Sequence, residues 1–228
     1  MSVFDLAEFA QPHPPIVRAP SLLPYRAMFA CEHYALRILD MPVQVPNDPV
    51  FYVPEFAERF RPFLRHCRSA MGARGFGQYA YLTVDQGLVK AGHGQRELGC
   101  HVDGLQGARV QPKVQTDTSF VVSDALPTVF YPHRTWQVDG LDIARDNLFR
   151  AFDAQARPED EWRPQPYEVV ECSAYTVHRA DTAPHDLVRT FLRLAYSVRQ
   201  YDRLGNSVNP LLGRLWRYET RETQRGLQ

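Results

Sequence analysis

The stretch Gly99–Gly104, GCHVDG, contains a histidine and an aspartate two residues apart. In a β-strand, residues two apart point to the same face, so the imidazole of His101 and the carboxylate of Asp103 are expected to converge. Either they pair with each other, or they hold a third group between them. A His-x-Asp pair is weak evidence by itself in a chain with eight histidines, so it needs support from elsewhere in the sequence.

That support comes from residues 174–197, AYTVHRADTAPHDLVRTFLRLAYS. His178 ends one predicted strand, and the two-residue period places Arg189 and Arg193 on one face of the next strand. Two arginines on the inner face of an apolar strand are costly to bury unless each is paired with an anion. The pattern therefore requires either two buried acidic side chains or one dicarboxylate ligand.

His101, Asp103 and His178 together offer two neutral imidazoles and one carboxylate. This set suits Fe(II) bound on one face, with three coordination positions left open for ligands and O₂. A structural zinc site is usually closed by four ligands, often including cysteine. The four cysteines of this chain form no C-x-x-C pair, and we expect them to be reduced, mostly buried thiols.

The elements that must position these residues begin with helical or irregular support over residues 1–77. Eight prolines within the first 52 residues favour extended segments and turns, with one short helix near 26–38. The next segment, from residue 53, has apolar residues at helical spacing, which predicts a helix that is kinked at Pro62 and ends at Gly72 or Gly75.

From residue 78 the hydrophobic period changes to two. Several short segments separated by Gly, Pro, Asp or Asn are predicted strands: 78–87, 100–104, 118–124, 127–132, 167–172, 174–180 and 189–201. A helix predicted over 141–156 interrupts them. This pattern is typical of a sandwich or barrel. We therefore expect one domain over 1–228, mainly β with flanking helices, with a β-rich core at 78–200 and a tail at 201–228.

Composition limits the partners that we expect. The formal net charge is +0, so no electrostatic footprint for nucleic acid or an anionic membrane is present. No apolar run approaches the ~20 residues of a membrane span. The first residues lack a basic region followed by an apolar core, so no signal peptide is expected. These features together predict a cytoplasmic protein.

The pattern His101-x-Asp103 … His178 … Arg189-x-x-x-Arg193 resembles that of the Fe(II)/2-oxoglutarate-dependent oxygenase superfamily. The spacing of His178 and the arginines is similar to that of the taurine dioxygenase and clavaminate synthase branch. The resemblance covers about residues 78–200 and is one of motif and strand order. It implies a double-stranded β-helix, also called a jelly roll, with a cupin-like core.

The resemblance also implies a cofactor and a reaction. His101, Asp103 and His178 would bind Fe(II), and 2-oxoglutarate would chelate the iron. Its 5-carboxylate would bind Arg193, and Arg189 would help with the 1-carboxylate or lie behind the ligands, although the two arginines can be exchanged. Reaction with O₂ would release succinate and CO₂ and leave a ferryl species. The expected activity is hydroxylation of a polar small molecule, such as an amino acid, a nucleoside or a natural-product intermediate.

Further candidate residues lie near the metal strand. Tyr79, Tyr81, Gln95 and Arg96 are candidate substrate contacts; the alternatives are core packing for the tyrosines and a solvated loop for the other two. Lys113 and Thr118 are weaker candidates for ligand contacts. His133 is a rival metal ligand without a carboxylate at strand spacing, and His185 is expected to be exposed.

Two other functions fit the same residues. A cupin-like metal-dependent dioxygenase or isomerase would use the triad without 2-oxoglutarate, and its arginines would be structural. A non-catalytic β-sandwich binding module would use the pocket for a sugar or a small acid. The helix predicted over 141–156 is expected to be a packed insertion, and it can also cover the mouth of the barrel or make a homodimer contact.

Overall fold

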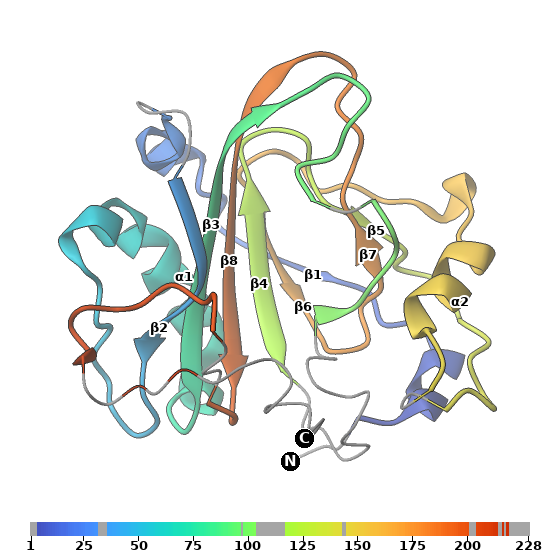
Figure 1. The fold of residues 1–228 in the computed structure, drawn as a ribbon, viewed down its shortest axis with the longest axis horizontal. Helices are drawn as coiled ribbons and strands as arrows, with labels where there is room; N and C mark the ends of the chain where they lie inside the picture. Colours follow the sequence, from blue (N-terminus) through green and yellow to red (C-terminus); the bar gives the residue numbers. More distant parts are fainter. Residues whose placement is uncertain are drawn as a thin grey trace.

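A computed structural model describes residues 4–31, 36–96, 98–103, 117–142, 145–200, 204–213, 216 and 218. Its centre is a large antiparallel sheet, which a small antiparallel sheet faces (Figure 1). In spatial order the strands of the large sheet are β1 (Ile16–Arg18), β6 (Val169–Cys172), β4 (Thr118–Ser123), β8 (Leu187–Ser197), β3 (Tyr79–Val89) and β2 (Leu36–Gln44).

The small sheet pairs β5 (Val129–Phe130) with β7 (His178–Arg179). Two isolated bridges widen it, one between His101 and His178 and one between Phe130 and Trp162. From β3 onward the described segments pass back and forth between the two sheets, except that β5 and the Trp162 segment follow one another in the small sheet, and each sheet receives four segments. This alternation is the topology of a double-stranded β-helix, so the predicted fold class is confirmed.

Helix α1 (Arg61–Met71) covers the outer face of the large sheet (Figure 1). Its residues Phe63 and Leu64 are fully buried in one cluster with Leu82 and Leu192 of the sheet. Burying an apolar side chain of this size contributes about 1.5–3 kcal/mol, so this layer is a main source of stability. The helix ends at Gly72, whose φ of +55° favours glycine, as the sequence predicts.

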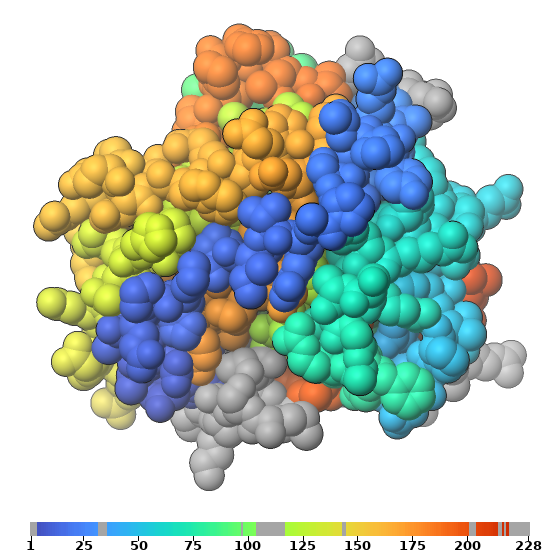
Figure 2. All heavy atoms as spheres, turned by 180° about the vertical axis from the view of Figure 1, so that it is seen from behind, coloured from blue at the N-terminus to red at the C-terminus, as the bar shows by residue number. Residues whose placement is uncertain are grey.

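The other helices in the described residues are short. They are η1 (Leu6–Ala10), η2 (Leu23–Phe29), η3 (Glu55–Phe60), η4 (Gly72–Gly75), α2 (Leu148–Gln155) and η6 (Pro158–Asp160). The N-terminal segment crosses the back of the molecule (Figure 2), and its strand β1 closes one edge of the large sheet. Within the described part of the chain, every helix is too short or too polar to traverse a lipid bilayer.

Several predicted boundaries are wrong. The helix expected near 26–38 is the 3₁₀ segment η2, and the chain from Leu36 is already strand β2. The helix expected over 141–156 begins only at Leu148, because Asn147 caps it through its side chain. Pro62 does not kink a helix; it lies in the first turn of α1, where a missing N–H is tolerated. Of the expected strand 100–104, the described residues 100–103 form only the single bridge at His101, and residue 104 lies outside the described residues.

The inner face of the large sheet bears the polar residues. Arg193 on β8 lies opposite Thr83 on β3, and Arg189 lies opposite Gly87. Because the side-chain period is two, Arg189, Phe191 and Arg193 share this face, as predicted. Val121 and Phe130 meet in one apolar cluster between the two sheets, which anchors the small sheet beside the arginines.

Candidate metal centre

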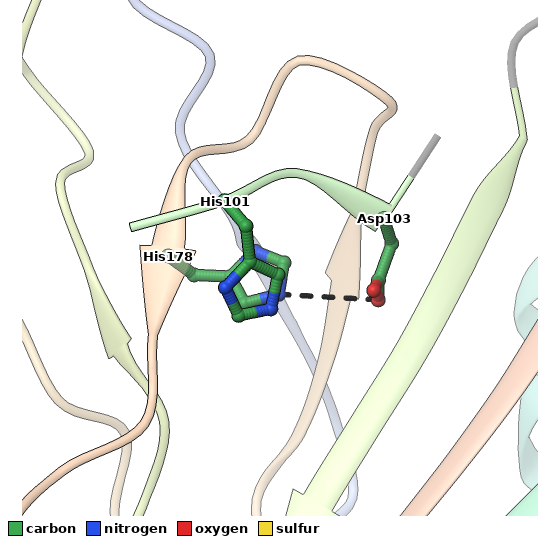
Figure 3. Close-up of side chains that lie close together, drawn as sticks. All are labelled: His101, Asp103 and His178. Carbon is green, nitrogen blue, oxygen red and sulfur yellow. Dashed lines mark ion pairs between the residues drawn. The ribbon is translucent and has the colours of Figure 1, made fainter. Parts of the chain in front are cut away.

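His101, Asp103 and His178 converge between the sheets (Figure 3). One ligand atom from each lies within 4.8 Å of the others. His178 Nε2 and Asp103 Oδ2 are 3.9 Å apart, a distance too long for a hydrogen bond. The bridge between His101 and His178 sets the two imidazoles side by side, because their backbones exchange hydrogen bonds of 2.8 and 3.0 Å. The spacing of the three side chains suits a cation that they share.

The backbone sets the tautomer of both histidines. Nδ1 of His101 lies 2.9 Å from the carbonyl oxygen of Gly99, and Nδ1 of His178 lies 2.9 Å from that of Thr176. A carbonyl oxygen only accepts hydrogen bonds, so each Nδ1 must carry the proton. Each Nε2 then has a free lone pair, which is the form of histidine that binds metal ions.

Charge at the centre also favours metal binding. Burial and the neighbouring His101 lower the pKa of His178 to about 4, so this imidazole is neutral at pH 7. Burial alone would raise the pKa of the Asp103 carboxyl, but Arg193 and the two imidazoles bring it well below its ordinary value. The centre therefore presents a neutral imidazole and a carboxylate that need not lose protons to bind a cation.

Arg193 already has two acidic partners. Its Nη1 donates to Asp103 Oδ1 at 2.6 Å, and its Nη2 donates to Asp40 Oδ1 at 2.7 Å. All three side chains are largely buried. The arginine pattern required either two buried acidic side chains or one dicarboxylate ligand. Two buried acids are present, and both of them pair with Arg193.

Arg189 has a different environment. It is only 5% exposed, and it donates to the carbonyl oxygen of Ala125 at 3.0 Å and to the amide oxygen of Gln95. Both partners are neutral, and no carboxylate in the described part of the chain lies within ion-pair distance of it. Burial lowers its pKa to about 10, so the group remains charged at neutral pH. Arg189 is thus a buried cation without a paired anion among the described residues.

The predicted substrate contacts lie in two places. Gln95 donates to backbone oxygens of Asp85 and Arg189, and Arg96 Nε lies 3.5 Å from Asp85 Oδ2. Tyr79 and Tyr81 instead pack against Trp216, and the buried Tyr81 hydroxyl donates to the carbonyl oxygen of Arg199 at 2.9 Å. These contacts favour core packing for the tyrosines.

The weaker candidates lie apart from the triad or cannot be placed. His133 and His185 are exposed, and neither belongs to the metal-ligand cluster. Thr118 is half-buried at the start of β4, and Lys113 lies outside the described residues. No disulfide links the four cysteines, and three of them are buried, as expected.

Asp40 is the polar residue of this centre that sequence reasoning missed. It is 2% exposed and contacts Arg193, although it lies on β2, far from the other residues in sequence. The signal was present as a lone acid in the apolar run Ile38–Val43, ILDMPV. A carboxylate inside such a run is rarely buried without a partner.

No family model matches the sequence, and no curated protein matches it. Solved structures are similar in fold. EvdO2 from Micromonospora carbonacea var. aurantiaca aligns with a TM-score of 0.47 and 13% identity, over 96% of this chain and 98% of its own. It has also been solved with 2-oxoglutarate.

Two further structures align at similar levels. An oxidoreductase of the 2OG-Fe(II) oxygenase family from Burkholderia pseudomallei has a TM-score of 0.43 and 16% identity, over 95% of each chain. AviO1 from Streptomyces viridochromogenes Tue57 has a TM-score of 0.45 and 15% identity, over 86% of this chain and 96% of its own. The side chains of the metal centre, rather than these likenesses, support the function proposed below.

Proposed function

We propose that this protein is an Fe(II)- and 2-oxoglutarate-dependent oxygenase that acts on a polar small molecule. One observation carries the proposal: the imidazoles of His101 and His178 and the carboxylate of Asp103, from two distant parts of the chain, converge at one point between the sheets. Three protein ligands on one side are the arrangement typical of this class, because it leaves positions open for chemistry.

The residues fit Fe(II). His101 and His178 would each offer Nε2, and Asp103 would offer a carboxylate oxygen, while no cysteine belongs to the cluster in the described residues. When bound, iron and 2-oxoglutarate would supply the oxidation of a substrate C–H bond by O₂, with release of succinate and CO₂. The protein's part is to hold the ligands, anchor the co-substrate and seat the substrate.

The geometry supports an exchange of the two arginine roles. Arg193, expected to bind the 5-carboxylate, is occupied by Asp103 and Asp40. Arg189 is buried, charged and free of acidic partners among the described residues, and a guanidinium fork matches a carboxylate in shape and charge. We therefore assign the 5-carboxylate to Arg189, with Gln95 bracing its side chain.

Arg96 is the predicted substrate contact that the structure favours most. Its Nε is buried without a hydrogen-bond partner among the described residues, and its nearest carboxylate oxygen is 3.5 Å away. A polar substrate group would satisfy that donor. Substrate contacts from Tyr79 and Tyr81, a single oxygenase domain, a cytoplasmic location and a homodimer stay predictions.

The test is turnover by protein reconstituted with Fe(II) without oxygen and then exposed to O₂ and 2-oxoglutarate. We expect wild type to form succinate, with a further increase when a substrate is found by screening, and His101→Ala to form none. Undiminished succinate formation by His101→Ala would contradict the proposal. Oxygen uptake without 2-oxoglutarate would indicate the cupin-like alternative, and failure to retain iron would indicate the binding module.

A further inference from the structure

Asp40 is held in an unfavourable backbone conformation. Its φ is +43°, in the left-handed region that side chains with a Cβ rarely adopt. It lies where the register between β2 and β3 shifts, between Ile38 and Met41. Such strain persists only where the surrounding structure imposes it, and it gathers at functional sites. Here the bulge turns the carboxylate of Asp40 toward the inner face of the sheet.

Donors from two strands, β3 and β8, hold the Asp40 carboxylate. The Thr83 hydroxyl on β3 donates to Asp40 Oδ1 at 3.1 Å and accepts from the Asp40 backbone N–H at 3.2 Å. Arg193 on β8 donates to the same carboxylate oxygen at 2.7 Å. Since Thr83 and Arg193 are opposite one another across β3 and β8, the strand register places both donors at this point.

The guanidinium of Arg193 donates to two carboxylates, those of Asp40 and Asp103. One terminal nitrogen binds Asp40, and the other binds Oδ1 of Asp103, so Asp40 limits the rotation of the guanidinium. The Nε of Arg193 has no hydrogen-bond partner among the described residues, so it adds no restraint. With Oδ1 of Asp103 taken, Oδ2 is the oxygen left facing His178.

We propose that Asp40 is a positioning residue that, through Arg193, keeps Asp103 a one-oxygen ligand of the metal. This inference rests on the proposed function only in that a divalent metal binds at the triad. A carboxylate that binds through both oxygens would occupy a fourth position. Keeping Oδ1 on Arg193 leaves three positions open, as chelation by a 2-oxo acid and binding of O₂ require.

A general effect of charge must be separated from positioning, and Asp85 provides the matched control. It lies on the same face of β3, two residues from Thr83, and it pairs with Arg96 rather than with Arg193. Asp85→Asn removes the same charge from the same sheet face without loosening Arg193. Asp40→Asn keeps the side-chain shape, and asparagine tolerates a positive φ.

The experiment is a titration of the metal-free full chain with Co(II). Binding is monitored through the visible absorption bands of the bound ion. Loss of an outer partner of a metal ligand typically weakens metal binding by about 10–100-fold, and we expect this for Asp40→Asn. We expect Asp85→Asn to change the affinity by less than about threefold, because Asp85 pairs with Arg96 and does not restrain Arg193 or a metal-ligand side chain. The bands of the Asp40→Asn complex should also change shape.

Two results would overturn the inference: Asp40→Asn within threefold of wild type, or equal weakening by both variants. If Asp40→Asn does not fold, Thr83→Val replaces it, since it removes the hydroxyl that holds Asp40. Weaker Co(II) binding by folded Thr83→Val supports the inference, and unchanged binding overturns it. Wild type that binds no Co(II) would instead overturn the proposed function.

Discussion

Replacing Arg189 by methionine tests the assignment of the 2-oxoglutarate anchor. A guanidinium has five N–H donors, and the Arg189 side chain uses two of them on Ala125 and Gln95. Two of the others can grip a carboxylate. A hydrogen bond to a charged group is worth about 1.5–3 kcal/mol, so losing two costs at least ~3 kcal/mol. At about 1.4 kcal/mol for each factor of ten, 2-oxoglutarate should bind Arg189→Met about 100-fold more weakly.

The assay is an anaerobic titration of the Fe(II) protein with a 2-oxo acid. Binding is monitored through the weak visible charge-transfer band of the bound 2-oxo acid. Pyruvate is the matched ligand, because it keeps the chelating end and lacks the distal carboxylate. We expect Arg189→Met to weaken 2-oxoglutarate binding about 100-fold and to leave pyruvate binding unchanged. Equal weakening of both ligands, or unchanged 2-oxoglutarate binding, would refute the reasoning.

Two further predictions concern stability. Burial raises the pKa of Asp117 to about 7, above its unfolded value of 3.8, so the native metal-free protein keeps a proton that the unfolded chain releases. The free energy of unfolding should therefore fall by roughly 4 kcal/mol at most as the pH rises from about 4 to about 7. Urea unfolding of Asp117→Asn should lack this part of the pH dependence. The same pH dependence in wild type and Asp117→Asn would contradict the prediction. Glu171, buried on the α1 side of the sheet, pairs with Arg18 at 2.6 Å and Arg74 at 3.2 Å. Glu171→Gln should lose about 1–3 kcal/mol in thermal unfolding and leave Co(II) affinity unchanged, and a weaker Co(II) complex would be the contrary result.

The strands that carry His178 and the two arginines were predictable because local patterns encode them, whereas the strand expected around His101 and Asp103 is only a single bridge. The two-residue period places Arg189 and Arg193 on one face, and the structure agrees. His101 and His178 meet through a single backbone bridge, which the sequence suggests only through their shared chemistry. Local periodicity therefore predicted a sandwich or barrel and the shared face of the arginines, whereas the double-stranded β-helix was implied by the family resemblance.

The partners of the arginines could not be predicted in the same way. Asp40 reaches Arg193 only because β2 pairs with β3 through a shifted register, and such long-range pairing leaves no local pattern. Pro42 argued against a strand in the sequence. It is tolerated in β2 because β2 is an edge strand. The choice between Arg189 and Arg193 depended on these contacts, so sequence alone left it open.

The most direct test of the metal centre is a crystal structure from crystals grown anaerobically with Fe(II). Diffraction is measured on both sides of the iron absorption edge. We expect one anomalous peak bound by His101 Nε2, His178 Nε2 and a single oxygen of Asp103, with Arg193 still on the other oxygen. A peak held by other residues, or no peak between the three side chains, would contradict it.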